Sequence, residues 1–283
     1  MKRILIVGDS NGLGEWGQIT PGPGVANNNN NTIFRPFNQD KYLDSKYPKP
    51  FQVVWPGFGY YLETLFGHAV ANHSFGGAGN FDAVFKSEEA LGLAPPFTAS
   101  TFYNPDLIIW MLTEPIRNYT RVEKQRLGSS EAGLIDLEKH FEASYKAGID
   151  YTKTVRELDR TLVQVAFEGA QRVYDETNIP WIVIEGWGRT WGMENDYSFI
   201  KHVHKDWLKK ILGRDIPLVT SWEGLNNIQA LRPDLAETEE FKKIVNDYEE
   251  IVNYMKESDD FPDNAHPGRI LHEQLAKELE PYV

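Results

Sequence analysis

A serine near the start of the chain, and a histidine and an aspartate near its end, have the chemistry of a catalytic triad. Ser10 lies in the turn sequence Gly-Asp-Ser-Asn-Gly at residues 8–12, and His266 follows Asp263 by three residues. A serine hydroxyl is a weak nucleophile until a base removes its proton. An aspartate that binds one ring nitrogen of a histidine can direct the other nitrogen toward the serine. Together, a serine, a histidine and an aspartate of this kind indicate catalysis of acyl transfer.

Both segments also have plain structural interpretations. Gly, Asp, Ser and Asn all favour turns, so residues 8–12 could simply reverse the chain. Asp263 could cap the last helix beside an unrelated His266. The other histidines of the seven fit core, helix or surface positions: His68, His73, His140, His202, His204 and His272.

Five short apolar runs rich in β-branched residues predict the strands that must position these side chains. Each run is continuous rather than alternating, which is typical of parallel strands covered on both faces. The runs are Arg3–Val7, His68–His73, Asp106–Leu112, Trp181–Glu185 and Pro217–Thr220. Ser10 follows the first run, and ligands of such sheets bind at the carboxyl ends of the strands.

Segments with helical periodicity lie between these runs and after them. They are Gly59–Phe66, Asn80–Leu91, Asp150–Thr177, Tyr197–Leu212, Glu237–Met255 and Arg269–Leu279. The alternation predicts an α/β fold, a flavodoxin-like doubly wound sheet of five parallel strands with helices on both faces. We expect one domain over residues 1–283, with long insertions at about 11–56 and 119–149 where turn formers or charges accumulate.

Three familiar motifs do not account for the first turn. The segment matches the G-x-S-x-G elbow of α/β-hydrolases, but that elbow follows several strands and Ser10 follows the first. A phosphate-binding loop would need Gly-Lys-Ser/Thr, and the dinucleotide fingerprint G-x-G-x-x-G is absent at this turn. A different serine-hydrolase architecture is therefore required.

Gly-Asp-Ser after the first strand and Asp-x-x-His before the last helix resemble the SGNH (GDSL) superfamily of serine esterases and lipases. Residues 72–77, Asn-His-Ser-Phe-Gly-Gly, are similar to the family's second block, Asn-x-Gly-x-x-Gly, with Ser74 in place of its first glycine. Residues 105–112 look like the strand of the third block. The resemblance implies a catalytic triad of Ser10, Asp263 and His266, and backbone oxyanion donors at Ser10 and Gly77.

The third block departs from the family pattern. The family ends this strand with Gly-x-Asn-Asp, whose Asn is the third oxyanion donor, whereas this chain reads Thr-Glu-Pro-Ile at residues 113–116. Proline has neither an amide side chain nor a backbone N–H. Candidates for the missing donor are Arg117, Asn118, Thr113 and Asn80. Loss of one donor lowers the rate by about 10² to 10³.

Aromatic residues after the fourth and fifth predicted strands suggest the substrate class. Trp187, Arg189 and Trp191 follow one strand and Trp222 the other. Aromatic faces beside polar groups suit sugar rings or a small acyl group, so we expect a carbohydrate ester or a small acyl ester rather than a long-chain lipid. The same tryptophans also fit core packing or a lid.

Composition narrows the partners. The chain carries 29 Lys and Arg against 41 Asp and Glu, a net charge of −12, which disfavours nucleic acid and anionic lipid. It has no cysteine, so thiol nucleophiles and thiolate metal sites are excluded. No apolar stretch predicts a membrane span or a signal peptide, and we expect a cytoplasmic location. The resemblance implies neither a metal nor an organic cofactor.

Two other functions compete with the esterase. The altered third block also fits a catalytically impaired SGNH-fold module that binds glycans or has a structural role. A flavodoxin-like protein that binds a nucleotide or flavin is a further alternative, and in that case the ligand would raise the melting temperature.

Overall fold

The computed structural model describes residues 1–13, 57–74, 78–94, 104–115, 155–231, 233–258, 260–261 and 266–283. In this part of the chain, five parallel strands form one sheet in the order β2-β1-β3-β4-β5. Their bounds are Arg3–Val7 (β1), Ala69–Asn72 (β2), Leu107–Leu112 (β3), Trp181–Glu185 (β4) and Ile200–His204 (β5). The expected α/β class and doubly wound parallel sheet are confirmed. The connection from β1 goes to β2 on one side and the chain then returns to β3 on the other.

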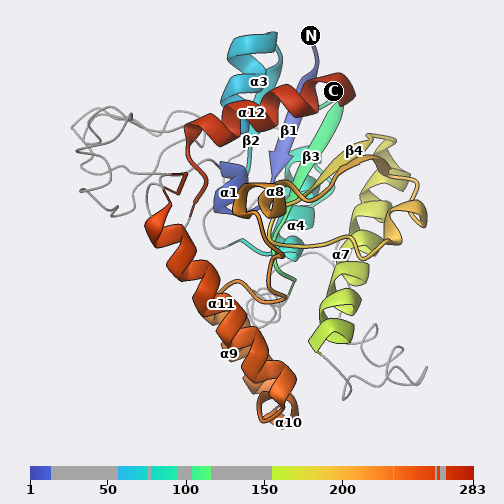
Figure 1. Cartoon of the computed structure of the whole chain (residues 1–283). Helices are drawn as coiled ribbons and strands as arrows, with labels where there is room; N and C mark the ends of the chain where they lie inside the picture. Colours follow the sequence, from blue (N-terminus) through green and yellow to red (C-terminus); the bar gives the residue numbers. More distant parts are fainter. Residues whose placement is uncertain are drawn as a thin grey trace, which may run out of the picture.

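Helices cover both faces of this sheet (Figure 1). Side chains of β1 show how the layers separate, because Leu5 and Val7 pack into one apolar cluster and Ile4 and Ile6 into the other. The first cluster is closed by α4 (Asn80–Leu91), α7 (Val155–Thr177), α9 (Trp222–Leu231) and α10 (Pro233–Ala236). The second is closed by α3 (Phe58–Phe66), α8 (Trp207–Leu212) and α12 (Arg269–Leu279), while α11 (Glu239–Glu257) contributes to both. In Figure 1, α3 and α12 lie next to each other.

Short helical turns complete the described elements. The helix α1 comprises Ser10–Leu13, and two 3₁₀ turns cover Met193–Asn195 and Glu280–Tyr282. The predicted helices 80–91 and 269–279 are confirmed residue for residue, and α3 begins one residue earlier than expected. Of the predicted helix 150–177, the described part forms α7 from residue 155.

The predicted fifth strand was wrong. Residues 217–220 form no strand, and residues 200–204, which we expected within a helix, form the edge strand β5 beside β4. Strand β5 is partly exposed at one edge of the sheet, and Ile200-Lys-His-Val-His lacks the continuous apolar character that identified the other four strands. Pro217 has no N–H to donate to a ladder, and the N–H of Thr220 donates to the side chain of Glu114 instead.

The two predicted insertions lie almost entirely outside the described residues. Only residues 11–13 of the first are described, and they belong to α1 rather than to an irregular segment. The single-domain assignment for 1–283 stays a prediction. No helix in the described ranges combines the length and the apolar character needed to cross a membrane.

Candidate functional site

The turn after β1 is shaped by a glycine and a buried aspartate. Gly8 has φ +149°, and a Cβ placed on it would lie 2.8 Å from the carbonyl oxygen of Met111 on β3. Asp9 is fully buried, and its Oδ1 accepts a hydrogen bond from the backbone N–H of Asn11 at 2.9 Å. This pairing closes an Asx turn. Ser10 therefore follows directly from β1 and begins the helix α1 at the carboxyl edge of the sheet.

The segment after β2 is hydrogen-bonded to this turn. The Asn72 side chain donates through Nδ2 to the carbonyl oxygen of Gly12 at 3.0 Å and accepts through Oδ1 from the N–H of Ser74 at 3.0 Å. A Cβ on Gly12 would lie 2.7 Å from Ser74 Oγ, so the two segments are in close contact. The sequence similarity to the second block thus coincides with a contact between that block and the serine turn. Gly77, the expected oxyanion donor, lies outside the described residues.

Two polar side chains fix the end of β3. Asn80 donates from Nδ2 to the carbonyl oxygen of Thr113 at 2.8 Å and accepts from its N–H at 3.1 Å. The buried Glu114 accepts hydrogen bonds from Thr220 and from the hydroxyl of Ser221. Asn80 and Thr113, two candidates for the third oxyanion donor, are therefore bonded to each other. The other two, Arg117 and Asn118, lie outside the described residues.

His266 is buried just before α12, with 4% of its surface exposed. It lies close enough to His272 to influence its protonation: burial, with a smaller effect from His266, lowers the pKa of His272 to about 3. The ring of His272 packs near Phe58 at 6.3 Å and Trp207 at 5.7 Å between centroids. Asp263 lies outside the described residues.

These ring contacts place the start of α12 relative to the sheet. Phe58 is the first residue of α3, which leads into β2, and Trp207 is the first residue of α8, which follows β5. In a parallel α/β sheet both helix starts lie at the carboxyl edge of the strands. His272 packs against both, so the start of α12 lies near this edge, and so does His266, three residues before the helix begins. The turn that carries Ser10 lies at the same edge.

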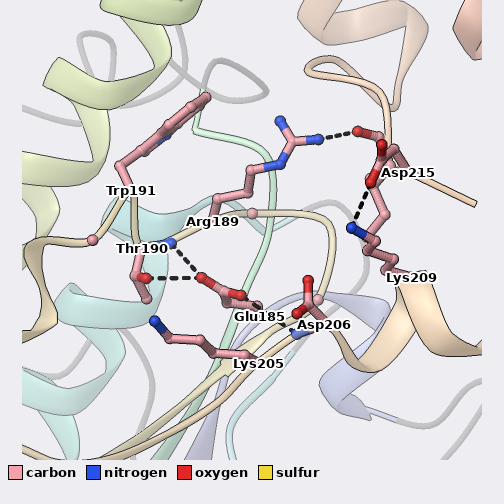
Figure 2. A pocket seen from close by; sticks show the side chains of 12 residues that line it. Glu185, Arg189, Thr190, Trp191, Lys205, Asp206, Lys209 and Asp215 are labelled. Carbon is pink, nitrogen blue, oxygen red and sulfur yellow. Dashed lines mark hydrogen bonds and ion pairs between the residues drawn. The ribbon is translucent and has the colours of Figure 1, made fainter.

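A cavity of about 260 Å³ opens beyond the carboxyl end of β4 (Figure 2). Arg189 and Trp191, two of the four residues that the sequence suggested for substrate binding, line this cavity. Trp187 does not line it and is buried in the apolar cluster with Trp207. Trp222 also lies outside this cavity, 56% exposed on α9, with its ring edge-to-face against Tyr248 at 5.2 Å.

Trp191 is held in an unusual conformation. Its φ of +56° lies in the left-handed region that residues with a Cβ rarely occupy. Its indole Nε1 donates to Asp159 Oδ2 at 2.8 Å, and the guanidinium groups of Arg189 and Arg156 lie 5.5 and 5.8 Å from its ring centroid. Sequence reasoning missed Asp159, because it stands among charged residues at 156–160 that look like a solvated helix face.

Asp159 itself is 2% exposed, and its Oδ1 has no hydrogen-bond partner within the described ranges. Burial raises the pKa of this carboxyl to about 7, partly offset by nearby Arg189 and the Trp191 hydrogen bond. No group of three or more His, Asp or Glu within the described part of the chain is arranged to hold a metal ion.

Comparisons with known proteins add a distant likeness. No family model matches the chain, and no curated protein matches it. Two solved structures are similar in fold. The first, a carbohydrate esterase whose active site is described as having divergent catalytic and non-catalytic binding functions, gives a TM-score of 0.40 at 14% identity. This likeness covers 99% of the chain and 64% of that esterase, so the chain spans about two thirds of its length.

The second is a catalytic mutant of Axe2, an acetylxylan esterase from Geobacillus stearothermophilus, with a TM-score of 0.34 and 13% identity over 99% of this chain and 94% of that one. Identity and TM-score are low for both esterases. The function is therefore inferred from the chain's own residues.

Proposed function

We propose that this protein is a serine ester hydrolase of the SGNH type, with Ser10 as nucleophile, His266 as general base and Asp263 as the residue that orients the histidine. The observation that carries the proposal is the position of the two chain ends. The Ser10 turn follows β1, and His266 is buried before α12 near helix starts at the same edge of the sheet. A second observation also supports the proposal: the Asn72 side chain after β2 donates a hydrogen bond to the Gly12 carbonyl oxygen of the serine turn.

The proposed reaction has two steps. The Ser10 hydroxyl oxygen attacks the ester carbonyl carbon while His266 takes the hydroxyl proton, and the protonated imidazole then gives that proton to the departing alcohol. An acyl-enzyme remains on Ser10. Water then attacks it, His266 again accepts and returns a proton, and the carboxylic acid leaves with Ser10 restored. Asp263 stabilises the imidazolium that forms in each step.

The negative charge on the attacked oxygen needs hydrogen-bond donors. We assign the backbone N–H groups of Ser10 and Gly77 to this role. Asn80 is already bonded to the Thr113 backbone, so Arg117 and Asn118 are the first candidates to test as the third donor. Ester substrates with a carbohydrate or small acyl part fit the polar, partly aromatic surroundings of Trp191 better than a long lipid chain does.

The deciding experiment is hydrolysis of 4-nitrophenyl acetate by the parent chain and by Ser10→Ala, His266→Ala and Asp263→Asn. We expect each of the first two substitutions to lower kcat by about 10³-fold or more, with the fold intact by circular dichroism. A fluorophosphonate probe should label the parent and not Ser10→Ala. Equal rates in parent and variants, or labelling that survives loss of Ser10, would show the assignment to be wrong.

A non-catalytic glycan-binding module is the second candidate, favoured by one observation. Pro115 stands where the family's third block has its Asn donor, and the carboxylate of the neighbouring Glu114 is buried against Ser221 and Thr220. Binding of oligosaccharide without any ester turnover by the parent chain would support this second candidate.

A further inference from the structure

We infer that the cavity beyond β4 is a subsite for a neutral saccharide ring, and that Asp159 is the positioning residue that holds its tryptophan, Trp191, in place. The inference rests on the proposed ester hydrolase function, since it assigns this subsite to the alcohol part of the substrate. Neither the position of Asp159 nor its contact with Trp191 was expected from the sequence.

The distance from the serine turn is suitable for a subsite beside the reaction. The sheet order places β3 between β1, which leads to Ser10, and β4, which leads to the cavity. Two strand spacings separate them, about 10 Å. The loop after β4 also contacts the end of β3, where the N–H of Gly188 donates to the carbonyl oxygen of Leu112 at 3.1 Å. A substrate that reaches from Ser10 into the cavity would therefore extend beyond its ester group.

The charges of the cavity favour a neutral ligand. Its lining contains three cationic and three anionic side chains: Arg189, Lys205, Lys209, Glu185, Asp206 and Asp215. Several already have partners, since Lys209 pairs with Asp215 at 2.6 Å and Lys205 pairs with Glu194. A phosphate or a uronate would meet as many carboxylates as ammonium groups, whereas sugar hydroxyls can donate to the carboxylates and accept from the cations.

Polar side chains line the cavity below and beside Trp191, whose ring points away from most of them and has Arg189 at its side (Figure 2). Glu185 Oε1 accepts from both the N–H and the hydroxyl of Thr190 at 2.8 Å, which fixes the floor of the cavity. The Arg189 guanidinium donates to the carbonyl oxygen of Ile216, and within the described ranges no carboxylate pairs with it. A pyranose has a mixed polar and apolar surface. The groups that match it here are the remaining N–H groups of Arg189, the exposed Asp206 carboxylate and the Trp191 ring.

Asp159 supplies the rigidity. It lies on α7, one helical turn after Arg156, so the same helix face contacts the Trp191 ring and its Nε1. A tryptophan at φ +56° is costly unless its surroundings fix it, and residues in such conformations concentrate at binding sites. A carboxylate buried to 2% exposure is costly as well. The positive φ of Trp191 and the burial of the Asp159 carboxylate both lower the stability of the fold. We explain their presence at one contact by the need to hold the Trp191 ring in place for a ligand.

The test measures binding of neutral cellotetraose and xylotetraose, and of anionic trigalacturonate, to the Ser10→Ala chain by isothermal titration calorimetry. We expect at least one neutral tetrasaccharide to bind, and trigalacturonate to bind at least tenfold more weakly. Trp191→Ala and Asp159→Leu should each weaken neutral binding at least tenfold. Asp159→Asn should keep it within about threefold, because an amide oxygen can still accept from Trp191 Nε1.

Matched controls separate positioning from general damage. Tyr60→Ala removes an exposed ring on α3, and Asp175→Asn changes an exposed carboxylate on α7. Neither should alter saccharide binding. Unchanged binding in Trp191→Ala, or an equal loss in Asp159→Asn and Asp159→Leu when both are folded, would overturn the inference, as would absence of binding by any neutral tetrasaccharide.

The esterase proposal and the subsite can fail independently. In the catalytically intact chain, the controls Tyr60→Ala and Asp175→Asn should leave kcat/KM for 4-nitrophenyl acetate within about twofold, because both exposed positions lie outside the proposed triad and the cavity. Trp191→Ala and Asp159→Leu should raise KM for an acetylated tetrasaccharide with little change in kcat. Suppose that only Ser10→Ala abolishes hydrolysis of 4-nitrophenyl acetate and that Trp191→Ala does not change KM for the sugar ester. The subsite would then be disproved, and the esterase proposal would stand.

Discussion

The side-chain amide of Asn72 donates a hydrogen bond to the carbonyl oxygen of Gly12 over 3.0 Å. This bond joins the end of β2 to the short helix that begins at Ser10, across 60 residues of sequence. The other end of the same amide accepts from the N–H of Ser74 at 3.0 Å. One buried side chain therefore sets the position of the serine turn relative to the segment that leads to Gly77.

Replacing Asn72 by Ala should loosen that turn. The Gly12 carbonyl and the Ser74 N–H would lose their partner, and an unsatisfied buried polar group costs about 1 to 3 kcal/mol. We expect a loss of this size in the free energy of unfolding by urea, together with a lower kcat for 4-nitrophenyl acetate. Asn253→Ala, at an exposed position of α11, is the control and should change neither. A fully stable and active Asn72→Ala would contradict this account of the turn.

Gly8→Ala should be much more destabilising than an ordinary glycine substitution. Gly8 combines φ +149° with a Cβ position 2.8 Å from the Met111 carbonyl oxygen, so backbone strain and a steric clash add together. Gly213 provides the comparison, because its φ of +63° is also left-handed but nothing lies within 4 Å of its Cβ position. We expect about 1 kcal/mol for Gly213→Ala and at least twice that for Gly8→Ala. Equal losses in thermal or urea unfolding would show that β1 and β3 do not approach as described.

His272 should make the protein less stable in mild acid. Burial lowers its pKa to about 3 in the folded state, below the usual 6.5, so the unfolded chain binds a proton that the folded chain excludes. The stability is fully present above pH 6.5 and is lost as the pH falls toward 3, with a slope of up to about 1.4 kcal/mol per pH unit.

In His272→Leu this part of the pH dependence should disappear. The measurement is the free energy of unfolding between pH 4 and 8 for both chains, and His202→Leu serves as the comparison at a partly exposed histidine. A parent and a His272→Leu chain with parallel pH profiles would mean that His272 is not neutral and buried in the folded state.

Asp159 should affect the pH dependence of stability in the opposite direction to His272, making the protein less stable as the pH rises. Burial raises its pKa to about 7 from 3.8, so between these values the folded chain holds a proton that the unfolded chain has lost. Its contribution to stability is greatest below pH 4 and declines as the pH rises to 7. Asp159→Asn should therefore gain stability relative to the parent across that range, reaching about 1 to several kcal/mol above pH 7.

Unfolding of the two chains at pH 5 and pH 8 measures this difference. Asp175→Asn, which changes an exposed carboxylate on the same helix, is the control variant. A stability difference between parent and Asp159→Asn that is equal at both pH values would argue against a protonation change at Asp159.

Much of the sheet could be predicted from sequence because its inner strands are covered on both faces. Runs such as Leu107–Leu112 contain only apolar residues, and every one of them is buried. The edge strand Ile200–His204 was missed for the corresponding reason, since one partly exposed strand shows neither a continuous apolar run nor a clear alternation. The hydrophobic pattern of a segment reflects which of its faces are buried, so this pattern is hardest to recognise in a segment that is only partly buried.

The sequence by itself determined the chemistry available at each end of the chain: Ser10 after the first strand, and His266 after Asp263 before the last helix. Only the tertiary structure decided which polar groups satisfy one another, such as Asn80 with Thr113 and Asp159 with Trp191. Local sequence patterns contain no record of such pairs, because the partners lie 33 and 32 residues apart and are brought together by burial in one core. Trp187 and Trp191 illustrate the same limit. They are four residues apart, yet Trp187 is buried in one apolar cluster, whereas Trp191 packs partly buried against the other cluster and lines the cavity.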